Sequence, residues 1–313
     1  ARLGAKVTIY EKRERLGGVV SAIIPNFRID DSVIAKDAAL LEKLGVKVLY
    51  NTEAPAVDVL KKEYDSVILA VGAYKRGELK LEGGEAQNAL AFLEDYNRTN
   101  GKMAIGKNVV VIGGGNTAMD TARAAKRCDG VEHVYLVYRR TKRYMPADEH
   151  ELVLAVEDGV EFRELLAPEK LENGQLICRV MKLGELDASG RAGIVETDET
   201  VAVPADRVIA AVGEKVPTDF YEANGLQVDD RVKVSPTLES SVENVYVIGD
   251  GLYGPSIVVK AMAQAITAAE AICGREISGS CDIAADPASI YAKKGILAEP
   301  GDKPESERCL GCS

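Results

Sequence analysis

The sequence has few cysteines for its length and no long apolar run. No stretch reaches the roughly 18 consecutive apolar residues that a membrane span requires. The 6 cysteines in 313 residues are scattered, except for one pair near the end, and so do not form a disulfide framework. No secretory signal is visible. The scattered cysteines predict a protein of the reducing cytoplasm, and the lack of a long apolar run predicts no membrane partner.

Histidine and basic charge are also scarce. There are 2 histidines, His133 and His150, and 39 basic residues stand against 49 acidic ones, which gives a net charge of −10. This balance argues against a nucleic-acid partner. His133 begins a predicted strand and His150 lies among carboxylates, so surface or core roles are more typical of them than catalysis. The length predicts about two domains, and an apolar fraction of 46% is ample for their cores.

A strand, turn and helix motif lies in the middle of the chain. Residues 108–126 read NVVVIGGGNTAMDTARAAK, where a β-branched run precedes three glycines and a helical segment. Gly113, Gly115 and Ala118 have the G-x-G-x-x-A spacing of a dinucleotide-binding fingerprint. Gly113 permits the turn, Gly115 lets the backbone approach a pyrophosphate, and Ala118 allows close helix packing. The start of the helix then favours phosphate, although similar turns also occur with nothing bound.

The next predicted strand, residues 132–138, lies where this fingerprint places the ribose-binding strand. It is followed by Arg139 and Arg140, whereas an NAD site usually has Asp or Glu there. Arginine suits a 2′-phosphate through charge-assisted, bidentate bonds, so NADPH is favoured and NADH is the alternative. A solvated basic loop that includes Lys142 and Arg143, or a nucleic-acid patch, is the other interpretation.

Repeated segments predict a second nucleotide-binding unit. Residues 67–72 (VILAVG) and 208–213 (VIAAVG) are near copies at matching places in the two units. A further strand at 245–250 and a helix at 256–272 have no counterpart in the central unit. They are expected to return the chain to the first unit. The predicted fold class is therefore α/β, with two Rossmann-like domains, the second inserted in the first.

The start of the chain suggests that one strand is missing. Residues 4–11 (GAKVTIYE) predict a strand that ends in Glu11, and only Ala1-Arg2-Leu3 precede it. By analogy with the central unit, its glycine turn should come before Ala1. We therefore expect the sequence to begin inside the first βαβ unit, with an ordinary edge strand as the alternative. The missing strand is central in a doubly wound sheet, so its loss would leave its neighbours unpaired.

Five motifs in order resemble the two-dinucleotide-binding-domain flavoproteins of the glutamate synthase small-subunit type. They are YEKRERLGG (10–18), IPNFRI (24–29), VIGGGNTAMD (111–120), YRR (138–140) with MPA (145–147), and VIGDGLYGPSIVVKAMAQA (247–265). This group includes the flavin and NADPH portion of dihydropyrimidine dehydrogenase. Residues 1–275 are most similar to the flavoprotein part of the related proteins called selenate reductases. The resemblance implies an FAD-dependent NAD(P)H oxidoreductase that passes hydride from NADPH to FAD.

The resemblance also implies a set of cofactor-binding residues. For FAD, it implies Glu11 at the ribose, a phosphate-binding segment, Arg28 near the flavin, Asp250 at a hydroxyl, and a helix start aimed at the flavin ring. The phosphate segment is Gly17, Gly18 and Val19, and the helix start is Ser256, Ile257 and Val258. Gly72 and Gly249 complete this side, and a turn-forming role is the alternative for Asp250. The implied NADPH residues are Gly113, Gly115, Asn116, Thr117, Ala118, Arg139, Arg140, Arg143, Gly213 and Glu214.

The resulting domains are an FAD-binding part (1–99), the inserted NAD(P)H-binding domain (100–215), a second FAD-binding part (216–278) and a tail (279–313). In the tail, Cys309 and Cys312 form a C-x-x-C that could begin a ferredoxin-type cluster site. A zinc half-site or plain thiols are the alternatives. Two cysteines cannot hold a cluster, so a [4Fe–4S] cluster is expected only in a longer parent protein. An iron–sulfur acceptor domain or subunit is then the expected partner.

No catalytic side chain is expected. Residues 15–30 contain no cysteine, and Cys128 and Cys178 are single and far apart in the sequence. A reactive pair beside the flavin is therefore lacking, which argues against disulfide reduction. Hydride transfer between cofactors needs no general base. The alternative function is a non-catalytic nucleotide-binding interaction module.

Overall fold

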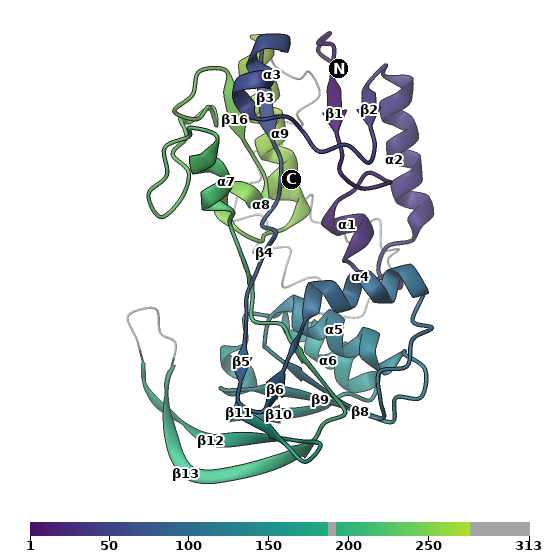
Figure 1. Cartoon of the computed structure of the whole chain (residues 1–313), viewed down its shortest axis with the longest axis vertical. Coiled ribbons are helices and arrows are strands. Elements are labelled where there is room, and N and C mark those ends of the chain that lie inside the picture. Colours follow the sequence, from purple (N-terminus) through teal and green to yellow (C-terminus); the bar gives the residue numbers. More distant parts are fainter. Residues whose placement is uncertain (187–191, 276–313) are drawn as a thin grey trace, which may run out of the picture.

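The computed structural model describes residues 1–186 and 192–275, which form two α/β units (Figure 1). In the first unit, β1 (Thr8–Tyr10) pairs in parallel with β2 (Lys47–Leu49), and β3 (Val67–Leu69) pairs in parallel with β16 (Val245–Val247). Its helices are α1 (Val19–Ala22), α2 (Asp31–Lys43), α3 (Val57–Glu63), α7 (Thr218–Ala223), α8 (Asp250–Tyr253) and α9 (Val258–Cys273). The pairing of β16 with β3 confirms that the chain returns to this unit after completing the second one.

The two strand pairs of the first unit form separate sheets in the described part of the chain. In Figure 1 they stand on opposite sides of this unit, with β1 and β2 beside α2, and β3 and β16 beside α3 and α9. The strand predicted before Ala1 lies outside the described residues.

The second unit is built on a parallel sheet of 5 strands in the order β10-β9-β8-β14-β7. Its strands are β7 (Gln87–Asn88), β8 (Asn108–Ile112), β9 (His133–Tyr138), β10 (Glu161–Glu164) and β14 (Arg207–Ala210). The central strand β8 carries three successive valines, Val109, Val110 and Val111, that are fully buried. Both faces of this strand are covered, which explains why its sequence is continuously apolar instead of alternating.

Helices cover one face of this sheet and an antiparallel sheet covers the other. The helices are α4 (Ala89–Thr99), α5 (Asn116–Lys126) and α6 (Glu149–Glu157), with a short turn η1 (Lys142–Tyr144) before α6. The antiparallel sheet comprises β11 (Leu166–Glu172), β12 (Gln175–Leu186) and β13 (Ala192–Pro204). Leu176 and Cys178 of β12 are buried against Val110 and Val137 of the parallel sheet. The sequence patterns did not predict this second layer.

Two short strands connect the units and pair with each other. β4 (Lys75–Arg76) is antiparallel to β15 (Glu214–Lys215), and the Gly77 N–H donates to the Gly213 carbonyl at 2.9 Å. A Cβ on Gly77 would lie 2.5 Å from that same oxygen, so the close approach of the two connections requires glycine. The hairpin of β5 (Lys80–Leu81) and β6 (Gly84–Glu85) follows β4 and lies beside β11.

The chain enters the second unit earlier than the predicted boundary after residue 99. Strand β7 pairs with β14, and Phe92 of α4 is fully buried in the core beneath α5. Asn88 caps helix α4, and its side-chain oxygen accepts the Leu90 and Ala91 N–H groups at 3.0 and 3.3 Å. Strand β7 has only two residues and α4 carries no cofactor motif, so no sequence pattern assigned them to the second unit.

Phe92 provides a test of this core. Replacing Phe92, which is 0% exposed, with Ala should lower the free energy of unfolding by about 3–5 kcal/mol, because the substitution leaves a cavity between α4 and α5. Denaturant unfolding measures the loss. The control Val153→Ala, at a 45% exposed position of α6, should change it by less than about 0.5 kcal/mol. Equal effects of the two substitutions would contradict the packing described here.

Candidate functional site

The glycines between β8 and α5 differ in what a side chain would meet. A Cβ on Gly113, which has a φ of 149°, would lie 2.5 Å from the Ala211 carbonyl oxygen, and one on Gly114 would lie 2.5 Å from the Tyr138 ring. Packing within the protein therefore requires both glycines. A Cβ on Gly115 would meet no atom within 4 Å, and its φ of −96° is open to any residue. The protein itself gives no reason for glycine here, whereas a closely bound phosphate would.

The start of α5 is suited to an anion. Gly115 caps the helix and offers no side-chain acceptor to its first N–H groups, and the first turn carries no acidic residue. Asn116 is exposed, and its side-chain oxygen accepts the Asp148 N–H at 3.0 Å, which ties this turn to the start of α6. The helix is 11 residues long, so its positive end and exposed N–H groups fit the predicted pyrophosphate site.

The arginines after β9 contain an unsatisfied donor. The Arg140 Nε donates to the Ala192 carbonyl at 2.8 Å, while its Nη1 is buried and has no hydrogen-bond partner within the described residues. Arg139 and Arg143 are exposed. A buried guanidinium N–H without an acceptor is costly. Arg139 and Arg143 are thus open to a ligand, whereas Arg140 is held against β13, and the role of the three arginines at a 2′-phosphate stays a prediction.

Side chains from both units meet where the chain crosses between them. Burial raises the pKa of Glu214, the negative charge of Asp250 raises it further, and a hydrogen bond with Thr117 opposes the shift. Burial also raises the pKa of Asp250, and the Ser256 N–H, 3.0 Å from its Oδ1, opposes that shift. Thr117 begins α5, Glu214 lies in β15 and Asp250 begins α8. The pKa of Glu214 thus depends on one residue from each unit, Asp250 and Thr117.

The flavin-side residues near Asp250 surround a small cavity. Its volume is about 240 Å³, and its lining includes Gly249, Asp250 and Ser256. A Cβ on Gly251 would lie 2.5 Å from the Tyr221 hydroxyl and 3.4 Å from the Gly72 N, so the chain after β3 packs directly on the chain after β16. The hydrogen bond from the Ser256 N–H shows that the Asp250 side chain stabilises the loop that follows it. Its role towards FAD stays a prediction.

The start of α9 is exposed and apolar. Ile257 caps this 16-residue helix without a side-chain hydrogen bond, and Ile257 and Val258 are more than half exposed. N–H groups at the start of a helix beside apolar side chains could hold a flat ring that carries negative charge when reduced. This arrangement fits the predicted flavin contact.

The other flavin-side residues lie on the β1 and α1 side of the first unit (Figure 1). The Glu11 carboxylate accepts the Arg13 N–H at 2.8 Å, which fixes the turn after β1. Gly17 and Gly18 have positive φ angles of 109° and 51°, and a Cβ on Gly18 would meet nothing within 4 Å. Val19 is exposed. Gly18 and Val19 are thus open to a ligand, whereas a Cβ on Gly17 would lie 2.7 Å from the Ser21 Cβ, so packing requires that glycine. The assignment of these residues to FAD stays a prediction.

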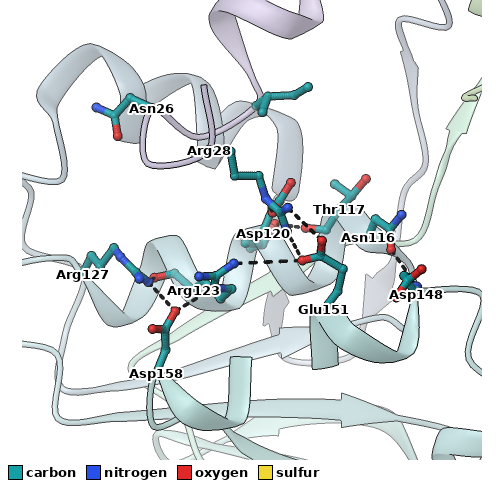
Figure 2. Close-up of polar contacts among 12 residues, drawn as sticks. Asn26, Arg28, Asn116, Thr117, Asp120, Arg123, Arg127, Asp148, Glu151 and Asp158 are labelled. Atoms are coloured by element: carbon teal, nitrogen blue, oxygen red, sulfur yellow. Dashed lines mark hydrogen bonds and ion pairs between the residues drawn. The ribbon is translucent and has the colours of Figure 1, made fainter. Parts of the chain in front are cut away.

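Arg28 is engaged with carboxylates of the second unit. Figure 2 shows its guanidinium directed at Asp120 of α5 and Glu151 of α6. The Nη1 lies 2.9 Å from Glu151 Oε1, and the Nε and Nη2 also bond to Asp120 and Glu151. The sequence resemblance placed Arg28 near the flavin, and that role stays a prediction. Sequence reasoning missed both carboxylates, because their motifs gave no sign that residues 24–29 pack on this unit.

Thiol, metal and membrane features are limited in the described part of the chain. Cys128 and Cys178 are buried, and burial raises the pKa of each thiol to about 12, so neither is a ready thiolate. Across residues 1–186 and 192–275, no cluster of His, Cys, Asp and Glu side chains could hold a metal ion, and no helix has the length and apolar character of a membrane span. Cys309 and Cys312 lie outside the described residues.

Proteins of known sequence share these features. The chain is 40% identical, over an aligned length of 335 residues, to Escherichia coli K12 YgfK, which is named an oxidoreductase; the alignment covers 100% of this chain and 32% of YgfK. It therefore spans about a third of the length of that relative. It is 33% identical to the glutamate synthase [NADPH] small chain of Azospirillum brasilense, over 86% of this chain and 61% of that protein.

The fold also matches a solved structure, that of Mycobacterium tuberculosis FprA in complex with NADPH. The TM-score is 0.69 at 20% sequence identity, over 96% of this chain and 81% of FprA. This likeness shows a common two-domain fold. Residues 1–265 match the family described as pyridine nucleotide-disulphide oxidoreductase. The chain therefore belongs to the pyridine nucleotide-disulphide oxidoreductase family.

Proposed function

We propose that this chain supplies the FAD-binding and NADPH-binding units of an oxidoreductase that transfers hydride from NADPH to FAD. The observation that carries the proposal is the close packing of the crossing segments on both predicted sites. A Cβ on Gly113 would lie 2.5 Å from the Ala211 carbonyl oxygen, and one on Gly251 would lie 3.4 Å from the Gly72 N, while the Gly77 N–H donates to the Gly213 carbonyl at 2.9 Å. Hydride transfer requires the reacting ends of both cofactors in one place, held in a fixed geometry. A site divided between the start of α5 and the loop after β16 meets this requirement.

The chain's own residues would bind and orient the cofactors. The N–H groups at the start of α5 hold the pyrophosphate, and Arg139, Arg140 and Arg143 hold the 2′-phosphate. When bound, the nicotinamide and the flavin supply the hydride chemistry. Burial keeps Glu214 protonated to a higher pH than a free carboxyl, so it can hold a proton on its side chain beside this site.

We further propose that the electrons continue to an iron–sulfur centre of a larger protein. Three facts support this: the C-x-x-C at Cys309 and Cys312, the much greater length of YgfK, and the subunit nature of the glutamate synthase small chain. The cysteine pair suits the first ligands of a ferredoxin-type cluster. Dithiol chemistry is not proposed, since Cys128 and Cys178 are separately buried.

The anaerobic visible spectrum of the full-length protein tests the hydride transfer. A bound flavin should give a yellow protein that NADPH bleaches. A colourless protein, or a yellow one that neither NADPH nor NADH bleaches, would contradict the proposal and favour a non-catalytic nucleotide-binding module.

Substitutions at Gly115 and Gly114 test whether each glycine is required by a bound phosphate or by packing within the protein. Gly115→Ala should leave the melting temperature unchanged, since the new Cβ meets no protein atom, and should weaken NADPH binding at least about tenfold by blocking the phosphate. Thermal unfolding and calorimetric titration measure the two effects. The matched variant Gly114→Ala should instead lower the melting temperature, because its Cβ would overlap the Tyr138 ring. NADPH binding that is unaffected by Gly115→Ala would rule out a phosphate at this turn.

The arginines decide which nucleotide is preferred. Replacing Arg139 and Arg140 together with Ala should weaken NADPH binding by about 10- to 100-fold and leave NADH binding nearly unchanged, because charge-assisted bonds to the 2′-phosphate are lost. Dissociation constants for both nucleotides measure the ratio. The control Lys107→Ala removes an exposed cation that pairs with Glu132 and should change neither constant. Equal losses for NADPH and NADH would refute the 2′-phosphate assignment.

A further inference from the structure

The two units are joined at a second place besides the paired connections β4 and β15. Residues 24–29 precede β2 of the first unit, yet they lie against helices α4, α5 and α6 of the second. The Asn97 side chain of α4 donates to the Ala22 and Ile24 carbonyls at 3.1 and 2.9 Å, and its oxygen accepts the Asn26 N–H at 3.1 Å. Asn26 in turn donates to the Asn100 side chain at 2.6 Å. We call residues 24–29 the clasp.

Phe27 anchors the clasp on the core of the second unit. The guanidinium groups of Arg123 and Arg127, both on α5 or at its end, lie over its ring at 5.1 and 4.3 Å. The ring of Tyr96 on α4 meets it edge-on at a centroid distance of 6.2 Å. Cation–π and aromatic contacts of this kind each contribute on the order of 1 kcal/mol. The clasp is therefore seated on two helices at once.

Arg28 forms the polar part of the clasp (Figure 2). Its three guanidinium nitrogens all bond to carboxylates, one to Asp120 and two to Glu151, in a pairing that uses the planar fork of arginine. The side chains of Arg28, Asp120 and Glu151 are only 24%, 14% and 18% exposed. Burial raises the pKa of Asp120 to about 6 even though Arg28 opposes the shift. Removing Arg28 would leave two nearly buried carboxylates beside each other, which is costly.

The position of Asp120 links the clasp to the nucleotide site. Asp120 is one turn after Thr117 on α5, the helix whose start forms the predicted pyrophosphate site. Because a helix moves as a rigid body, contacts that hold Asp120 also hold the start of α5. The other link, β4 with β15, pairs only two residues of each strand and can act as a hinge. An ion pair between Arg13 and Glu94 and the packing of Ala22 and Ile23 also join the first unit to α4, and the clasp adds the contacts that reach α5.

We propose that Arg28 is a positioning residue for hydride transfer, which holds α5 against the first unit so that a nucleotide at Gly115 faces the flavin side. This inference rests on the proposed function. Arg28 acts through Asp120 and Glu151 and need not touch either cofactor. Its loss should change the rate of hydride transfer much more than the affinity for NADPH.

The test compares Arg28→Lys and Asp120→Asn with wild type in the full-length protein. Lysine keeps the charge but not the fork, and asparagine keeps the shape, so both variants should fold. In anaerobic stopped-flow mixing, we expect flavin reduction to slow at least about tenfold, with the NADPH dissociation constant changed less than about threefold. The matched control Arg98→Ala removes an exposed arginine of α4 that pairs with Asp95 and should change neither quantity. An unchanged reduction rate, or a loss confined to affinity, would overturn the proposal.

A second measurement does not depend on turnover. Spin labels at Val59 of α3 and Val195 of β13, both exposed, report the distance between the two units. Wild type should give one narrow distance distribution, and Arg28→Lys a broader or shifted one. Identical distributions would overturn the positioning role. If NADPH fails to bleach the wild-type flavin while the distributions still differ, the proposed function fails and the clasp stands.

Discussion

The structure depends on the constraint that the chain crosses between its two units twice at nearly the same place. Backbone pairing of β4 with β15 and the close approach of Gly77 to Gly213 hold the outgoing and returning segments together. The second unit can therefore be completed, sheet and helices included, before β16 pairs with β3. The crossing also places Glu214 where the charge of Asp250 acts on it, in the region of the proposed site between the units.

The three glycines before α5 differ in whether packing within the protein requires them. Gly113 and Gly114 are required by the Ala211 carbonyl and the Tyr138 ring. Gly115 has open space around it, so packing within the protein does not require its lack of a side chain. Arg140, in contrast, is held by the Ala192 carbonyl of β13, and its Nη1 is buried without a partner among the described residues. The open space at Gly115 is the observation that fits the predicted nucleotide phosphate.

The carboxylates around Arg28 pair with two different groups of arginines. Asp120 and Glu151 bond to Arg28, while Asp158 accepts Arg123 and Arg127 at 2.7 Å each. Arg123 and Arg127 thus pair with Asp158 and also stack on the Phe27 ring of the clasp. A contact between two units that combines an aromatic anchor with buried, bidentate ion pairs is more directional than an apolar surface, since each pair tolerates little rotation.

The sequence determined the elements whose pattern is local. The apolar run of β8, the glycine turn, the helix α5 and the arginines after β9 could be predicted because strand, turn and helix propensities act within a few residues. The sequence also predicted that β16 returns to the first unit, from a strand without a counterpart. Only the tertiary structure decided that β7 and α4 join the second unit, that β12 covers its sheet, and that Arg28 bonds to Asp120 and Glu151. These features depend on pairing and burial between residues far apart in the chain, which leave no periodic signal in either partner alone.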